Sequence, residues 1–102
     1  MSEHDADVTV RDNSELNRYE ALVDPDGEQT VAGFATYEVD DGRITFLHTE
    51  VDDAYGGHGI GGAIVQQSLD DVRAKGFTVH PVCPFYKKFI KGHPEYEDLL
   101  AG

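Results

Sequence analysis

The stretch "YGGHGIGGAIVQQSL", residues 55–69, joins a glycine-rich loop directly to an amphipathic helix. Gly57, Gly59 and Gly62 in it spell G-x-G-x-x-G, the pattern of dinucleotide-binding loops. Such a loop also needs an acidic residue about 20 positions further on to bind the ribose. The chain has "HPVC" at the end of the next predicted strand, residues 80–83. The pattern therefore does not predict NAD or FAD binding.

The start of this helix is the feature that still points to a phosphate. The apolar spacing predicts a helix from Ile60 to Lys75, with no Ser, Thr, Asp or Asn directly before it. The first N–H groups of a helix have no partners within it, so an uncapped start can hold an anion, and glycines allow a phosphate to come close. A glycine turn with water on these N–H groups is the alternative.

The residues before the loop predict an antiparallel meander of four strands. These strands are expected at residues 7–13, 18–24, 30–39 and 43–51. The second and third are joined by "PDG" at 25–27, and the third and fourth by "DDG" at 40–42. Gly33 inside the third strand suggests a bulge or a close backbone approach.

The residues after the loop predict a helix, a strand and a second helix. Gly76 should end the first helix, and residues 77–82 should form a fifth strand parallel to the fourth. A short helix is expected at 84–92, and a packed tail follows it. Its expected buried side chains are Phe85, Phe89 and Ile90, and those of the tail are Tyr96, Leu99 and Leu100. The expected fold is an α+β domain with a mixed sheet, formed by residues 1–102 as one domain.

The composition narrows the partners and the compartment. The 102 residues carry a formal net charge of −12, with 20 acidic residues against 8 basic ones. A chain this acidic repels nucleic acid and anionic membranes, so neither is expected as a partner. The acidity fits either an ordinary solvated surface or the cytosol of a halophile. The single cysteine, with no secretory signal or apolar span, favours a cytoplasmic protein, and a monomer is expected.

Four motifs in a fixed order carry a family resemblance. They are "LHTEV" at 47–51, "GHGIGGAIV" at 57–65, "VHPVCPF" at 79–85 and "HPEYEDLL" at 93–100. Together they resemble the GCN5-related N-acetyltransferases, and more narrowly their minimal single-domain subfamily. The loop of that family reads R/Q-x-x-G-x-G/A, which puts Gly59 and Gly61 in the two glycine places. Gly56 departs from the pattern, because it stands where Arg or Gln is usual.

The resemblance implies that the fourth and fifth strands splay apart and that acetyl-CoA lies in the wedge between them. It assigns the pantetheine arm to the backbone of Thr49, Glu50 and Val51. It assigns the pyrophosphate to the loop, that is to Gly57, His58, Gly59, Ile60, Gly61 and Gly62. From their charge, Lys87 and Lys88 are inferred to neutralise the 3′-phosphate. The expected activity is acetyl transfer from acetyl-CoA to an amine, and a CoA-binding module without turnover is the alternative.

Three residues are candidates for the chemistry, and each has a structural alternative. Cys83 is expected at the end of the fifth strand, as an acyl-accepting nucleophile, a wall of the thioester pocket or a small buried hydrophobe. His48 is either a general base or a half-buried histidine. Tyr86 matches the place where many relatives have a tyrosine that protonates the CoA thiolate, or it is a packed aromatic. Transfer is therefore either direct or through acetyl-Cys83, and no metal site is expected.

Overall fold

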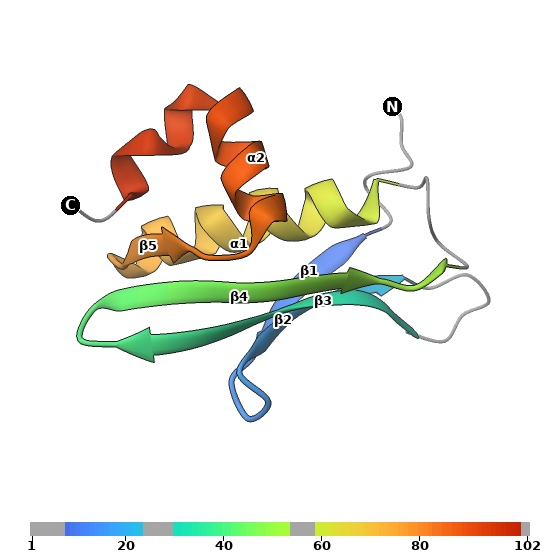
Figure 1. Ribbon diagram of the computed structural model, residues 1–102. Helices are drawn as coiled ribbons and strands as arrows, with labels where there is room; N and C mark the ends of the chain where they lie inside the picture. The colour runs from blue at the N-terminus through green and yellow to red at the C-terminus, as the bar shows by residue number, and fades with distance from the viewer. Residues whose placement is uncertain (1–7, 24–29, 54–58, 101–102) are drawn as a thin grey trace.

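The computed structural model describes residues 8–23, 30–53 and 59–100 as a mixed sheet with helices on one face (Figure 1). The sheet has five strands in the order β1-β2-β3-β4-β5, antiparallel except for the parallel pair β4–β5. The elements are β1 (Thr9–Asn13), β2 (Arg18–Val23), β3 (Thr30–Asp40), β4 (Arg43–Val51), α1 (Ile60–Lys75), β5 (Thr78–Pro81), α2 (Pro84–Gly92) and the 3₁₀ helix η3 (Pro94–Leu99). The predicted α+β fold and its strand directions are confirmed.

Local chemistry explains why the elements end where they do. The β3–β4 hairpin turns at Asp41 and Gly42, whose φ angles of 53° and 81° are those of a type I′ turn, the geometry that Asp-Gly favours. At the end of α1, Gly76 adopts a left-handed φ of 81°. Its N–H and that of Phe77 bond back to Arg73 O and Val72 O, which closes a Schellman motif. The predicted "PDG" turn lies outside the described residues.

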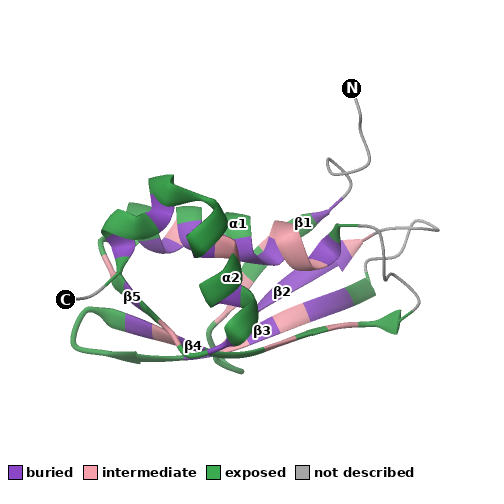
Figure 2. Cartoon of the chain, turned by 45° about the horizontal axis from the view of Figure 1, so that its top comes forward, coloured by how far each residue is buried: buried purple, intermediate pink, exposed green. Residues whose placement is uncertain are grey.

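Helix α1 packs one apolar stripe on the sheet, and Figure 2 marks the buried residues along the helix in purple. The apolar spacing places Ile60, Ala63, Ile64, Val65, Leu69 and Val72 on one stripe, and all of these are buried except Ala63, which is half-buried; Ser68, which is polar, is fully buried as well. The buried residues of the helix are Ile60, Ile64, Val65, Ser68, Leu69 and Val72. No described helix of this chain is long and apolar enough to cross a membrane.

Gly33 of β3 marks a close approach of backbone and helix, as expected. A β-carbon there would lie 2.7 Å from the Glu50 carbonyl oxygen and 3.1 Å from Ile64 Cδ1. The β2–β3 register also shifts beside it, since Ala21 pairs with Gly33 but Leu22 pairs with Val31. Only glycine lets β4 and α1 come this close to β3 at this point.

The buried face of α2 was wrongly predicted at one position. Tyr86 and Ile90 are the buried residues, four positions apart on one side of the helix, and Phe89 is half-buried. Phe85 is 43% exposed. In the tail, Tyr96 and Leu99 are buried as expected, whereas Leu100 is 40% exposed although it bridges to Val79. Local spacing could not show which flank of so short a helix meets the core.

A buried carboxylate stabilises the β1–β2 end of the sheet. Glu20 is 2% exposed and accepts hydrogen bonds from Arg11, Asn13 and Arg18. Burial alone would raise the pKa of Glu20, but the bonds from these partners outweigh it, and the net pKa is lowered. Arg18 also lies 4.6 Å above the ring centre of Phe34. The charge at Glu20 is therefore fully compensated in the folded protein.

Candidate cofactor-binding site

The pairing of β4 with β5 covers only half of β4. It runs from Arg43–Thr78 to Phe46–Pro81 and stops there. The carbonyl of Phe46 then accepts the N–H groups of both Val82 and Cys83, at 3.0 and 2.9 Å, where the chain turns into α2. Residues 47–51 of β4 continue without a described strand on that side. β5 ends at Pro81 and the chain turns into α2, so residues 47–51 of β4 keep an edge without a strand partner; we call the region between this edge and the starts of α1 and α2 the wedge.

A β-bulge at the mouth of the wedge changes which β4 side chains face α1. Thr36 pairs with His48 but Tyr37 pairs with Phe46, so Leu47 is an extra residue in the ladder. Before it, Ile44 and Phe46 face the core. After it, the odd-numbered residues do so instead: Thr49 contacts Cys83, and Val51 lies beside Gly61. The extra residue thus brings Thr49 and Val51 into the wedge.

The backbone of this open segment has groups directed into the wedge. The N–H of Asp52 bonds to Ala32 O on β3 at 2.8 Å. In an antiparallel pair the residues alternate between bonding to the partner and pointing away from it. Glu50 therefore bonds toward β3, whereas the N–H and C=O groups of Thr49 and Val51 point to the open side. Of the three residues expected to bind the pantetheine arm, these two have the suitable direction.

The start of α1 lies at the same end of β4. Its N-cap, Gly59, has a left-handed φ of 74° and makes no side-chain cap bond, while its carbonyl accepts Ala63 N–H at 3.0 Å. No acidic residue lies in the first turn, so the helix dipole there is not compensated by one. The uncapped start that the sequence predicts is confirmed. The expected loop residues Gly56, Gly57 and His58 lie outside the described residues.

Gly61 and Gly62, both expected to bind phosphate, have different surroundings. A β-carbon on Gly62 would meet nothing within 4 Å. A β-carbon on Gly61 would lie 2.6 Å from Phe85 Cζ and 3.7 Å from Val51 Cγ2. The half-exposed ring of Phe85 therefore lies against the first turn of α1, next to β4. The sequence analysis placed Phe85 in the core and so did not predict this contact. It brings together residues of α1, α2 and β4, the three elements around the wedge.

Two pairs of polar side chains lie at the inner end of the wedge: Thr49 with Cys83, and Ser68 with Tyr86. Thr49 Oγ1 is 3.4 Å from Cys83 Sγ, and Cys83 is 4% exposed. Tyr86 is fully buried, stacked on Phe46 with ring centres 4.1 Å apart, and its hydroxyl is 2.8 Å from Ser68 Oγ. Because Ser68 gives its own proton to the Val65 carbonyl, Tyr86 must donate to Ser68.

The surroundings of Tyr86 favour its neutral form. Burial is the main cause that raises the pKa of Tyr86, the bond with Ser68 lowers it, and the nearby Cys83 raises it further. The net pKa lies above the usual value of a tyrosine. The hydroxyl thus keeps its proton and is already paired within the core. This geometry matches the packed-aromatic alternative for Tyr86.

His48 lies on the other face of β4 from Cys83. Its Nε2 is 2.9 Å from Glu50 Oε2, and both side chains are well exposed. A carboxylate only accepts hydrogen bonds, so Nε2 carries the proton, and a neutral ring keeps its lone pair on Nδ1. The structure therefore pairs His48 with Glu50 and Cys83 with Thr49. Among the described residues, no group of three His, Cys, Asp or Glu side chains could hold a metal.

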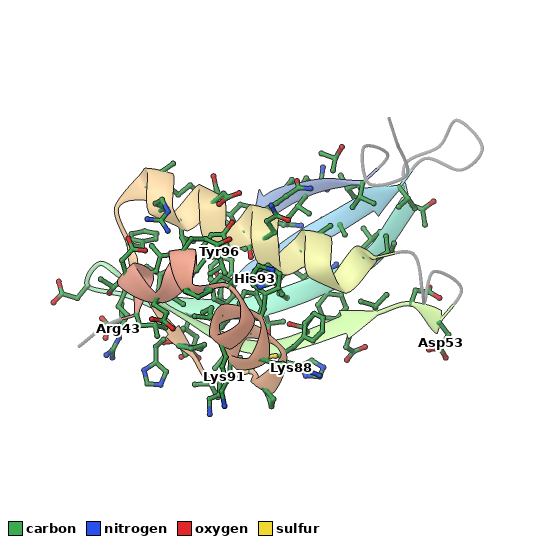
Figure 3. All side chains as sticks on the ribbon, turned by 90° about the horizontal axis from the view of Figure 1, so that it is seen from above. Arg43, Asp53, Lys88, Lys91, His93 and Tyr96 are labelled. Atoms are coloured by element: carbon green, nitrogen blue, oxygen red, sulfur yellow. The ribbon has the colours of Figure 1, made fainter. Side chains whose placement is uncertain are left out.

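The two candidate phosphate lysines lie on different sides of α2. Lys87 lines a cavity of about 250 Å³ between α2, β5 and η3. Lys88 is exposed and lies three positions after Phe85, on the same flank of the helix. Figure 3 shows Lys88 and Lys91 projecting from the side of α2 that faces away from α1. The assignment of the 3′-phosphate to Lys87 and Lys88 therefore stays a prediction.

The sequence did not predict that the side chains of Ser68, Phe85 and Thr49 lie in or beside the wedge. One signal for Thr49 was present, because the apolar pattern of β4 changes from even positions (Ile44, Phe46) to an odd one at Val51. Such a change of phase indicates a bulge. Ser68 also had a signal, because it lies four positions after Ile64 and four before Val72, on the buried stripe of α1.

Comparison with known proteins identifies the family. Residues 18–99 match the family described as GCN5-related N-acetyl-transferase. Protein NATD1 from Bos taurus is 41% identical over 59 residues, which are 57% of this chain and 52% of the bovine protein. Protein NATD1 from Homo sapiens is 39% identical over 59 residues, 57% of this chain and 52% of the human protein. The chain thus spans about half the length of these curated relatives.

A solved structure agrees with the fold. A GCN5-like protein from Staphylococcus aureus, determined in solution by NMR, superposes with a TM-score of 0.67 at 22% identity. The match covers 95% of this chain and 91% of that protein. At this identity the similarity concerns the fold. Because the family match covers residues 18–99, which is most of the chain, the protein belongs to the GCN5-related N-acetyltransferase family.

Proposed function

We propose that the protein transfers an acetyl group from acetyl-CoA to an amine, with the CoA lying in the wedge between β4 and β5. The observation that carries the proposal is the open half of β4, whose Thr49 and Val51 backbone groups lie at the same end as the uncapped start of α1. An extended arm with amide groups fits the strand edge, and its pyrophosphate fits the helix start. Membership of the family supports the same assignment.

In this proposal the transfer is direct. The amine lone pair attacks the thioester carbonyl, the C–S bond breaks, and the sulfur leaves as a thiolate that takes up a proton. His48 is the candidate base, because Glu50 holds Nε2–H and leaves the lone pair on Nδ1, and it would meet the amine on the face of β4 opposite Cys83. Cys83 forms a wall at the thioester end, beside Thr49. The alternative route, in which Cys83 first takes the acetyl group, uses the same wedge.

Tyr86 is assigned a packing role in this mechanism. Its ring is fully buried and its hydroxyl is bonded to Ser68, so it offers no surface to a bound thiolate. Tyr86→Phe is expected to lower stability and keep turnover. If Tyr86→Phe lost turnover while still binding CoA, the proton-donor role of Tyr86 would be restored.

Isothermal titration with CoA, followed by acetyl-CoA consumption over a panel of amines, tests the proposal. Binding with consumption supports a transferase, binding without consumption supports a CoA-binding module, and no binding overturns both. Cys83→Ala separates the routes, since retained turnover excludes acetyl-Cys83. His48→Ala should lower turnover at pH 7 by about 10²-fold or more with CoA affinity unchanged, because a positioned base contributes that much.

Other expectations from the sequence stay predictions. They are a single domain across residues 1–102, a cytoplasmic monomer, a salt-adapted acidic surface, and pyrophosphate contacts from Gly57 and His58. A titration of activity and solubility against salt checks the third of these. Full activity without added salt would contradict it, because an acidic coat adapted to strong salt repels itself when the salt is removed.

A further inference from the structure

Phe85 is a half-exposed aromatic residue that lies against the start of α1, at a point close to which Val51 of β4 also lies. It follows Cys83 and Pro84 at the beginning of α2, and 43% of its surface is exposed. An exposed aromatic on a short helix usually has no specific neighbour. Here the tip of the ring lies so close to Gly61 that a β-carbon on Gly61 would be 2.6 Å from Cζ and 2.8 Å from Cε2.

Val51 of β4 also lies close to Gly61. Its Cγ2 lies 3.7 Å from the same point on Gly61, and Val51 is half-buried at the end of β4. The Phe85 ring and Val51 therefore both lie beside Gly61, in the first turn of α1. The absence of a side chain at Gly61 is what lets the ring lie there. The surface formed by Phe85, Val51 and Gly61 is apolar and remains partly open.

We propose that Phe85 is a binding residue for the pantetheine arm of CoA, packing on the apolar part of the arm next to the pyrophosphate. This rests on the proposed function, since it deepens the same site. An arm that bonds to the backbone of Thr49 and Val51 and ends at the start of α1 must pass the Phe85 ring. The branched dimethyl carbon of the arm is its apolar part nearest the pyrophosphate, so it meets the Phe85–Val51 surface.

A titration with two ligands tests this assignment. CoA carries the arm, whereas adenosine 3′,5′-bisphosphate carries the nucleotide without it. Phe85→Ala is expected to weaken CoA binding about tenfold, the value for losing part of an aromatic contact, and to leave the bisphosphate within about twofold. Phe85→Leu should fall between. The matched control is Val39→Ala, which removes a similarly exposed apolar side chain (47%) beside the distant β3–β4 turn and should change neither ligand.

Each outcome has a defined meaning. Equal weakening of both ligands, or unchanged CoA affinity in Phe85→Ala, overturns the assignment of Phe85. A wild-type protein that binds neither ligand overturns the proposed function itself. If Phe85→Ala does not fold, the ring resonances of Phe85 in the wild-type protein supply the second measurement. They should shift when CoA is added and stay in place when the bisphosphate is added, and the absence of that difference also overturns the assignment.

Discussion

The two halves of β4 differ in their strand partners. Residues 43–46 pair with strands on both sides and place Ile44 and Phe46 in the core. Residues 48–51 pair with β3 alone, and Thr49 and Val51 are only half-buried. The bulge at Leu47 separates the halves. The difference shows that one strand both builds the core and leaves a free edge, so substitutions in the first half should cost stability and those in the second should change binding.

The largest stability loss should come from the paired half. Phe46→Ala removes a fully buried ring that stacks on Tyr86, and such a change costs about 3–5 kcal/mol. Val51→Ala, a smaller truncation in the open half, should cost about 1 kcal/mol or less because it removes less and its site is half-exposed. Urea unfolding of both variants measures this. Equal losses would contradict the division of the strand.

The charge at the β1–β2 end should make the paired part of the sheet sensitive to acid. Glu20→Gln removes a buried carboxylate bonded to Arg11 and Arg18 and should cost about 3 kcal/mol at pH 7. The folded pKa of Glu20 lies below its ordinary value of 4.5. Its contribution is therefore present above about pH 4.5 and is lost as pH falls through the folded pKa.

Thermal unfolding between pH 7 and pH 3 measures this dependence. The wild type should lose stability more steeply below pH 4.5 than Glu20→Gln does, because the variant lacks the titrating group. Glu38→Gln, at an exposed position of β3, serves as the control and should follow the wild type. Parallel acid limbs for wild type and Glu20→Gln would refute the assignment of acid sensitivity to this carboxylate.

A smaller effect is expected where β3 supports the open half. Gly33→Ala places a carbon 2.7 Å from the Glu50 carbonyl, so the backbone must shift, at a cost of about 2 kcal/mol. Gly62→Ala meets nothing within 4 Å and should instead stabilise α1 by up to about 1 kcal/mol. A lower melting temperature for Gly33→Ala together with a higher one for Gly62→Ala would support the close approach at Gly33. If Gly33→Ala left the stability unchanged, the backbone of β4 at Glu50 would have to move aside at no cost in free energy.

The smallest stability effect should be at Thr49. Thr49→Val keeps the shape and the strand preference but removes the hydroxyl 3.4 Å from Cys83 Sγ. The loss should be about 0.5 kcal/mol, since the contact is long and half-exposed. The rate of Cys83 alkylation should change more visibly, because the hydroxyl no longer contacts the sulfur. A stability loss near that of Phe46→Ala would show that the open half also belongs to the core.

Much of the fold follows from local sequence. The Asp41–Gly42 turn, the Gly76 helix end and the uncapped start of α1 each depend on a few adjacent residues. For this reason the bounds of β4, α1 and α2 match their predictions. The roles of the candidate site residues stay predictions. Thr49, Gly61 and Cys83 meet in or beside one wedge, although their separation in the chain is large.

What only the tertiary structure decided is which side chains face each other in that wedge. The bulge at Leu47 turns Thr49 and Val51 inward and leaves His48 with Glu50 on the other face. The packing of α2 turns Tyr86 into the core and Phe85 toward Gly61. A one-residue shift in register reverses every face that follows it, and the shift depends on the neighbouring strand. The sequence by itself determined the elements, their order and the glycine-rich helix start, because these depend on neighbours in the chain. Which side chains point into the wedge depends on contacts between distant segments, and these form only when the sheet and helices pack.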